Sequence, residues 1–499
     1  MFHKSKLMKL KTWRKHHKWL GLGFCFFMIM FCLSGIVLNH RGWFADVDVN
    51  RNLLPPQYHY KNWNNGLLRG TLPYTDNDSV NSILVYGTGG VWKTDAQLSQ
   101  TEDMNVGFPK GVDYRNIRNM AQTPSGDLFA VSPFGLFRYH QQQWENVVLP
   151  DKDAKLTDMA MKGDTLVVAS RSCLYVSPAP YDNFSRIQLK APADYDGKVS
   201  LFRTVWLLHS GELFGLIGKI LVDAIAIILI LLCITGLLYW LMPKYIKRKS
   251  RRGEKSNNAP KMLKWSFKWH DKIGRTTIVL TLFIAITGWC LRPPVLIALA
   301  TNKTHAIPGT TLSSDNAWND KLRVIRYDEK QQDWLLSTSE GFYTIRHFTD
   351  TPKKLDYAPP VSVMGLNVLQ KDTNGNWLCG SFSGMFIWNR EQNTAIDYYT
   401  HEPAPTEAGP PFGKKAIAGY SNDFAGKQCA VEFYEGCTDV PQPEVMEDIP
   451  MSLWNVALEV HTGRIYMGVV ATYIFIFIAG IIAVWCLWSG WKIRKRKKQ

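Results

Sequence analysis

Four apolar segments restrict what this chain can fold into. They cover residues 20–38, 213–241, 273–291 and 466–488. A helix needs about 20 apolar residues to cross the hydrocarbon core of a bilayer, and each segment is long enough or nearly so. The chain is therefore predicted to be a membrane α-helical protein with four transmembrane helices.

The first segment could be mistaken for a secretion signal, because basic residues precede it. Its apolar core is longer than that of a typical signal, and no small-x-small cleavage site follows it. We therefore expect a retained helix.

The lysines and arginines predict the topology. Residues 1–19 contain seven, residues 244–264 contain nine and residues 492–498 contain six, with Glu254 as the only acid among them. Because the whole chain carries a net charge of +16, the remainder sums to about −5. The positive-inside rule of membrane topology therefore explains the basic excess better than nucleic-acid binding does. It predicts a multi-pass membrane protein with cytoplasmic termini and two long stretches on the outer side of the membrane.

These features divide the chain into seven predicted parts. In order, they are a cytoplasmic N-terminus with helix one (1–41), a β-rich outer segment (42–205), helix two (206–242), a basic cytoplasmic loop (243–269), helix three (270–291), a second β-rich outer segment (292–455), and helix four with a basic tail (456–499). The two halves repeat one another in the same orientation, which predicts parallel repeats related by an axis along the membrane normal.

Four histidines carry the signature of this duplication. His17 and His270 each open an apolar run, with a glycine four residues on and a [Ser/Thr]-Gly pair ending 18 residues on. His209 and His461 each begin the pattern His-[Ser/Thr]-Gly-x-[Leu/Ile]-[Phe/Tyr]. The predicted axis brings His17 opposite His270 at the cytoplasmic edge, and His209 opposite His461 at the outer edge.

Two facing imidazoles on rigid helices are what the iron of a b-type haem needs as axial ligands. The sequence therefore predicts two haems, with His17, His270, His209 and His461 binding the iron. Zinc or copper is the weaker alternative, because closed sites of these metals usually take four ligands. An interfacial histidine with no ligand role is the other alternative for each position.

Several other residues are candidates near these sites. Arg275 and Arg464 either pair with haem propionates or act as interfacial cations. His40, without a histidine counterpart in the second half, is a candidate catalytic residue near the substrate, a further ligand, or a solvated loop residue. His16 competes with His17 for the inner haem. Lys219 and Asp223, four residues apart inside helix two, are expected to pair with each other.

The strings HKWLG and HDKIG, the [Ser/Thr]-Gly pairs and the LHSG string before helix two resemble the PepSY-associated transmembrane family. That family includes iron-regulated membrane proteins and haem-containing ferric-siderophore reductases. The resemblance covers the four helices and their flanks, about a quarter of the chain. It implies a four-helix core in the bacterial inner (cytoplasmic) membrane, which carries haem and passes electrons outward to ferric iron in the periplasm, where the two outer segments would lie. We find no recognisable PepSY domain in the outer segments.

The outer segments contain a recurrent pattern of an apolar strand, a small-residue turn and a second strand. It begins at Ser82, Asp127, Thr165, Asp333 and Asn376, with spacings of 38–45 residues within a segment. Repeats of about 40 residues that contain hairpins are typical of β-propeller blades, so we expect one propeller shared by both segments or two separate β-rich domains. Cys429 and Cys437 could close a small loop as a disulfide.

The combined prediction is a haem-containing, inner-membrane oxidoreductase that reduces a ferric siderophore or another ferric chelate. The short cytoplasmic segments contain no dinucleotide-binding motif, so the electron donor is expected to be a membrane quinol or a separate cytoplasmic reductase. The alternative is a membrane-anchored β-propeller that binds or senses a partner without redox activity. A transporter is less favoured, because no pair of helix-breaking segments lies near the midplane.

Overall fold

The computed structural model describes residues 10–75, 81–254, 258–362, 364–407 and 415–493. The chain divides into two compact units, each built from separate stretches of sequence. The helical unit contains Met1–Phe44, Gly197–Ser313 and Trp454–Gln499, and the β unit contains Ala45–Asp196 and Ser314–Leu453. Part of each basic segment, at residues 1–9, 255–257 and 494–499, lies outside the described residues.

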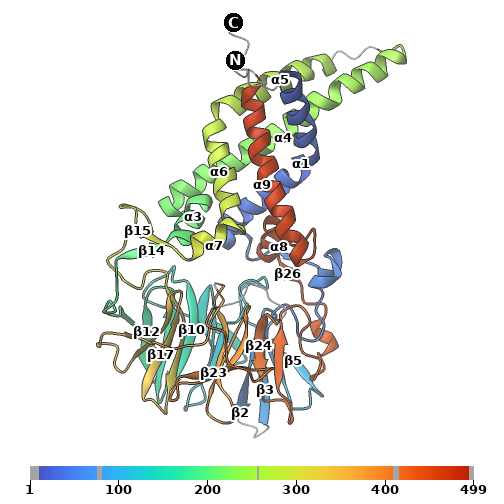
Figure 1. Cartoon of the computed structure of the whole chain (residues 1–499). Coiled ribbons are helices and arrows are strands. Elements are labelled where there is room, and N and C mark those ends of the chain that lie inside the picture. Colours follow the sequence, from blue (N-terminus) through green and yellow to red (C-terminus); the bar gives the residue numbers. More distant parts are fainter. Residues whose placement is uncertain (1–9, 76–80, 255–257, 363, 408–414, 494–499) are drawn as a thin grey trace. The chain divides into compact units, whose positions relative to one another are not determined.

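The helical unit is a bundle (Figure 1). Its helices are α1 (Leu10–Asn39), α2 (Arg41–Phe44), α3 (Leu201–Ser210), α4 (Gly215–Arg251), α5 (Asn258–Thr276), α6 (Ile278–Cys290), α7 (Val295–Ala300), α8 (Leu453–His461) and α9 (Val469–Lys492). A short ribbon pairs β14 (Lys198–Ser200) with β15 (Lys303–His305). The long helices contact one another in the closed order α1, α4, α6, α9. Large apolar side chains such as Phe26, Ile217 and Ile474 remain exposed on their outer faces, as expected of helices that face lipid.

Three helices are long and apolar enough to cross a membrane: α1, α4 and most of α9. The third predicted segment, 273–291, is not one straight helix. The chain breaks at Thr277 between α5 and α6, whose axes are bent by 69° relative to each other. Only the two helices together are long and apolar enough to cross a membrane. Thr276 and Thr277 both donate hydroxyl hydrogen bonds to the Ile273 carbonyl, and such back-bonding bends helices.

The β unit consists of antiparallel sheets. Within the described residues, five of them have four strands each: β2–β5 (Gly70–Thr75, Asn81–Gly87, Gly90–Thr94, Thr101–Asp103), β6–β9 (Asn119–Gln122, Leu128–Ser132, Gly135–His140, Gln143–Val147), β10–β13 (Leu156–Lys162, Thr165–Ser170, Leu174–Pro178, Ser185–Ile187), β16–β19 (Leu322–Asp328, Asp333–Thr338, Gly341–Ile345, Lys353–Lys354) and β20–β23 (Leu366–Lys371, Trp377–Ser381, Gly384–Asn389, Thr394–Asp397). Two shorter sheets pair β24 (Ile417–Ser421) with β25 (Cys429–Glu432), and β1 (Asp48–Val49) with β26 (Met451–Ser452). The five recurrent strings of the sequence form the middle hairpins of the four-stranded sheets.

The first strands of the sheets contact one another in cyclic order. β2 contacts β6, β6 contacts β10, β10 contacts β16, β16 contacts β20, β20 contacts β24, and β24 returns to β2. The sheet β24–β25 carries none of the recurrent strings, so the sequence pattern missed it. The apolar inner faces form clusters between neighbouring sheets, for example around Phe129 and Leu166, which are both fully buried.

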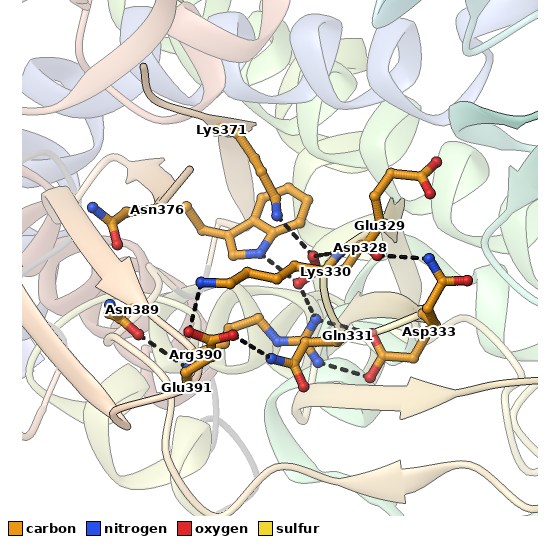
Figure 2. Close-up of polar contacts among 12 residues, drawn as sticks. Asp328, Glu329, Lys330, Gln331, Asp333, Lys371, Asn376, Asn389, Arg390 and Glu391 are labelled. Carbon is orange, nitrogen blue, oxygen red and sulfur yellow. Dashed lines mark hydrogen bonds and ion pairs between the residues drawn. The ribbon is translucent and has the colours of Figure 1, made fainter. Parts of the chain in front are cut away.

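Buried carboxylates join neighbouring sheets. Asp158 on β10 accepts a hydrogen bond from Asn119 on β6 (2.9 Å) and pairs with Arg326 on β16. Asp328, at the end of β16, pairs with Lys371 at 2.7 Å and with Arg390, and accepts a bond from the indole of Trp377 (Figure 2). These contacts connect strands that are far apart in the sequence.

We expect Asp328→Asn to destabilise the β unit by about 3 kcal/mol, because it removes the charge of a buried carboxylate that binds Lys371, Arg390 and the Trp377 indole. Arg390 keeps its two-point pair with Asp333, whereas the ammonium of Lys371 loses its carboxylate partner. Arg390 is only 7% exposed and Asp328 only 2%. Thermal unfolding of the full-length protein, followed by circular dichroism, measures the change. The exposed pair Lys330–Glu391 (Figure 2) is the control, and Lys330→Ala should change stability by less than about 1 kcal/mol. Equal effects of the two substitutions would contradict this role of Asp328.

The stabilisation of the β unit by Asp328 should depend on pH. Burial alone would raise the pKa of Asp328, but the hydrogen bonds from Lys371 and Trp377 and the charge of Arg390 lower that pKa from 3.8 to about 2. The folded protein therefore holds the proton less tightly than the unfolded chain does. The stabilisation is complete above pH 3.8 and is lost as the pH falls toward 2, so the stability difference between wild type and Asp328→Asn should shrink in this window.

Cys429 and Cys437 lie side by side in the β unit as thiols, and they form no disulfide in this structure. A hydrogen bond from Cys429 lowers the pKa of Cys437 to about 7. The backbone pairing of Glu432 with Gly436 closes the loop between them.

Candidate functional site

The helical unit brings the four predicted histidines together as two pairs. The ring centroids of His17 and His270 are 5.9 Å apart, and those of His209 and His461 are 6.2 Å apart. His17 lies on α1, His270 on α5, His209 on α3 and His461 on α8. The pairing agrees with the one inferred from the repeat, although α5 and α6 are separate helices.

The motif His-[Ser/Thr]-Gly positions the second pair. Gly211 ends α3 in the left-handed conformation at φ 78°, and Gly463 adopts φ 79° just after α8. Glycine tolerates this conformation, which stops a helix. An added Cβ at Gly211 would lie 2.2 Å from the carbonyl oxygen of Gly218, so this close turn needs glycine. Each histidine is therefore held in the last turn of a short helix.

One ring nitrogen of each histidine is held by the neighbouring helix. The Nδ1 atoms of His17, His270 and His461 lie 2.9, 3.0 and 2.9 Å from the carbonyl oxygens of Cys486, Leu232 and Phe31. The Nδ1 atom of His209 lies 3.1 Å from the Thr287 hydroxyl, and the Ile284 backbone is a further hydrogen-bond partner of this ring. Because a carbonyl oxygen only accepts, Nδ1 must carry the proton. This tautomer leaves Nε2 as the nitrogen that can bind a metal.

A hydroxyl and a glycine complete each histidine contact. Three residues beyond the accepting carbonyl lies a [Ser/Thr]-Gly pair, namely Ser34-Gly35, Thr235-Gly236, Thr287-Gly288 and Ser489-Gly490. The hydroxyl lies 3.1 Å from Nδ1 in three cases and 3.4 Å in the fourth. The imidazole packs on the glycine, where an added Cβ would lie 2.7–3.3 Å from ring carbon Cε1. The four histidines therefore share one local arrangement.

The two pairs fit the axial ligation of a haem iron. Two metal–imidazole bonds of about 2 Å and the dimensions of the rings place the centroids of two axial imidazoles roughly 6 Å apart. The separations of 5.9 and 6.2 Å match this value. Within the described ranges no group of three or more His, Cys, Asp or Glu side chains that could hold a metal ion occurs. Each pair offers two imidazole donors at this separation.

The sequence interpretation found only part of these contacts. It noted Gly35 and Gly288 as marks of the duplication but missed Ser489 and Gly490, whose signal was a second repeat of the [Ser/Thr]-Gly pair. Gly480, on α9, packs against a different side chain: an added Cβ there would lie 2.2 Å from the Trp289 indole. Gly21, one turn beyond His17, has open space where a Cβ would be.

His40 belongs to a polar cluster of the helical unit. Its Nε2 lies 2.5 Å from the Asp223 carboxylate, and its ring stacks on Trp43. Asn39 donates to the other oxygen of Asp223 at 3.2 Å, and Lys219 donates to the Asn39 carbonyl at 3.3 Å. The expected pairing of Lys219 with Asp223 is therefore wrong, because the α1 terminus supplies closer partners.

The two arginines predicted near the haems have carboxylate partners of their own. Arg275 pairs with Asp271 one turn earlier on α5, at 3.0 Å. Arg464 makes a two-point pair with Glu459 on α8, with Nε to Oε2 at 2.9 Å. His16, the alternative to His17, lies beside Trp485.

Comparison with known families supports the membrane assignment. The family model for the PepSY-associated TM region matches residues 1–242, which confirms the resemblance drawn from the sequence. His17 and His209 lie within the matched residues, and His270 and His461 lie beyond them.

No curated protein matches the chain. Among solved structures, two of the extracellular domain of BT4673 from B. thetaiotaomicron, described as a one component and as a hybrid two component system, match 73% and 78% of this chain. Their identities are 13% and 11% and their TM-scores 0.31 and 0.33, which are too low to assign their fold or role to this protein. The alignments cover only 37% and 39% of those chains.

Proposed function

The chain carries a PepSY-associated TM region, and we propose that its helical unit binds two b-type haems and moves electrons across the inner membrane. The observation that carries this proposal is the pairing of four histidines, each with Nδ1 beside a hydroxyl of a neighbouring helix. In three of them Nδ1 also contacts a backbone carbonyl of that helix. His17 and His270 would hold one haem, and His209 and His461 the other. A bound haem would supply one-electron redox chemistry at its iron.

The chain's own residues prepare both sites before any cofactor arrives. The hydrogen bonds to Nδ1 select one tautomer and restrict rotation of the ring, which raises the basicity of the ligand nitrogen. The glycines allow each ring to lie close to the neighbouring helix. Both effects reduce the reorganisation needed on binding and fix the position of the cofactor.

The proposed topology has four spans, with the bent pair α5 and α6 counted as the third. The positive-inside rule places the basic segments in the cytoplasm, so the pair His17 and His270 lies toward the inner side and the pair His209 and His461 toward the periplasm. A 20-residue helix is about 30 Å long, a distance too great for one fast electron transfer. Two haems placed inward from the two edges would divide it.

We further propose that the electron acceptor is a ferric siderophore or another ferric chelate in the periplasm, and that a quinol or a cytoplasmic reductase is the donor. The sheets of the β unit contact one another in a closed ring, and we propose that this unit is a β-propeller whose surface binds the ferric acceptor. Reduction to Fe(II) would weaken the hold of the chelator on the metal. His40, paired with Asp223 near the outer end of α1, is the proposed residue for the acceptor step.

The test of this function starts with the purified full-length protein. A pyridine haemochrome assay should give close to two haems per chain, and the dithionite-reduced spectrum should show a low-spin α-band. A colourless protein from haem-replete cells would contradict the redox function and favour a membrane-anchored binding module. Reduced protein should then be reoxidised by ferric siderophores, with the Fe(II) trapped by a ferrous-specific chelator. Reoxidation no faster than that by dissolved oxygen would exclude ferric chelates as acceptors.

His40→Ala should slow reoxidation by ferric chelates while leaving the haem content near two per chain. The physical reason is that His40 is tied to Asp223 and lies outside both histidine pairs, so its removal leaves the axial contacts in place. Stopped-flow reoxidation and the haemochrome assay measure the two quantities separately. The matched control is His59→Ala in the β unit, which should leave both unchanged. Loss of haem in proportion to the loss of rate would show that His40 has a structural role.

A further inference from the structure

Arg292 lies beside the outer histidine pair. It follows α6 directly, and its backbone N–H bonds to the Trp289 carbonyl at 3.1 Å. It lies five residues beyond Thr287, whose hydroxyl is 3.1 Å from His209 Nδ1, and four beyond Gly288, on which the His209 ring packs. The sequence interpretation did not single it out, because the string LRPP resembles an ordinary end of a membrane helix.

The charges around Arg292 do not balance. Its electrostatic neighbours are Arg464, Glu459 and Tyr473. Glu459 is already held by Arg464 in a two-point ion pair, so that carboxylate is committed. Within the part of the chain that the structure describes, the guanidinium of Arg292 itself makes no hydrogen bond or ion pair. One partly buried positive charge therefore remains next to the outer histidines, in surroundings where an unpaired charge is costly.

The repeat shows that this charge is specific to one half of the chain. Arg292 stands one position before Pro293, the counterpart of His40, and so takes the place of Asn39. In the first half, Asn39 and His40 bind the Asp223 carboxylate. In the second half an arginine and two prolines occupy the corresponding turn. The two halves of the chain therefore carry different polar groups at equivalent positions of the repeat.

We propose that Arg292 is the carboxylate anchor of the outer site and binds a propionate of the haem held by His209 and His461. This inference rests on the proposed function. A guanidinium matches a carboxylate with two parallel hydrogen bonds, and a b-type haem has two such carboxylates. Arg464, the arginine predicted from sequence, is instead the partner of Glu459. A positive charge at this position also favours the ferrous form over the ferric form, so Arg292 raises the reduction potential of the outer haem above the value it would otherwise have.

The test compares Arg292→Gln, Arg292→Lys and the control Arg248→Gln in full-length protein by potentiometric titration of the visible spectrum. Arg248 is an exposed residue near the C-terminal end of α4, so the control removes the same charge elsewhere. We expect Arg292→Gln to lower the potential of one haem component, changing its ferric-to-ferrous ratio at fixed potential at least about tenfold, which is 59 mV for one electron. Arg292→Lys should retain most of the potential, and Arg248→Gln should match wild type. The resonance Raman band of the propionate should shift in Arg292→Gln alone.

The outcomes are distinguishable from failure of the proposed function. A wild-type protein without haem would overturn both proposals. Two haems with unchanged potentials in Arg292→Gln would overturn only the role of Arg292. Loss of the outer haem from Arg292→Gln but not from Arg292→Lys would support the anchor, and equal loss from both would overturn it by showing a packing role. A lipid phosphate could bind the Arg292 guanidinium instead. In that case the difference in reduction potential between wild type and Arg292→Gln should disappear when phospholipid is removed. A shift that persists without phospholipid identifies the propionate.

Discussion

Replacement of His209 or His461 by alanine is expected to remove one haem and leave the other with its native spectrum. Each substitution deletes one imidazole of the outer pair, whose rings lie 6.2 Å apart and are proposed to hold that haem. His17→Ala and His270→Ala should remove the other component. The reason is geometric: within each pair the imidazoles face each other, so the loss of one leaves a single ligand and a polar gap among apolar helices.

The haemochrome assay and low-temperature spectra of the four variants measure this prediction. The haem content should fall from about two to about one per chain, with a shared spectral loss within a pair and different losses between pairs. His16→Ala is the matched control, because His16 neighbours His17 but lies beside Trp485, and it should keep both haems. Loss of the same component from His17→Ala and His209→Ala would refute the two-site arrangement.

Alanine at the four glycines that contact the imidazoles is expected to displace the rings. The displacement should be larger where less space is available for the added Cβ. An added Cβ would lie 2.7 Å from His209 at Gly288 and 2.9 Å from His17 at Gly490. At Gly35 and Gly236 the corresponding distances to His461 and His270 are 3.3 Å. Real Cβ contacts are almost never as close as the first two values, so the ring must move. Close-packed interiors give way only partially to added volume.

Each site therefore contains one severe and one mild position. Gly288→Ala should release most of the outer haem and Gly490→Ala most of the inner haem, whereas Gly35→Ala and Gly236→Ala should mainly lower haem affinity. Haem content after purification and after a competition with apo-myoglobin measures the series. Gly23→Ala is the control, because open space surrounds its Cβ position. Equal loss at all four glycines, or loss of haem in the control, would contradict a steric origin.

The sequence alone was sufficient to identify three of the helices that are long and apolar enough to cross a membrane, and the pairing of the histidines. Hydropathy is a property of consecutive residues, so the apolar runs around 20–38 and 213–241 could be recognised without a structure. The histidine pairing followed from the repeat, because parallel halves related by an axis must bring equivalent positions together. The hairpins of the β unit were also predictable, since each is a local pattern of two apolar strands and a small turn.

Only the tertiary structure could show how each histidine is held and which charges surround it. The carbonyl of Cys486 and the imidazole of His17 come from opposite ends of the chain, and no local pattern connects them. The same holds for Arg292, whose proposed role depends on the ion pair between Glu459 and Arg464. The break at Thr277 and the cyclic order of the sheets likewise arise from packing between distant segments. Periodicity and composition report on neighbours along the chain, whereas hydrogen-bond partners and charge balance depend on which helices meet in space.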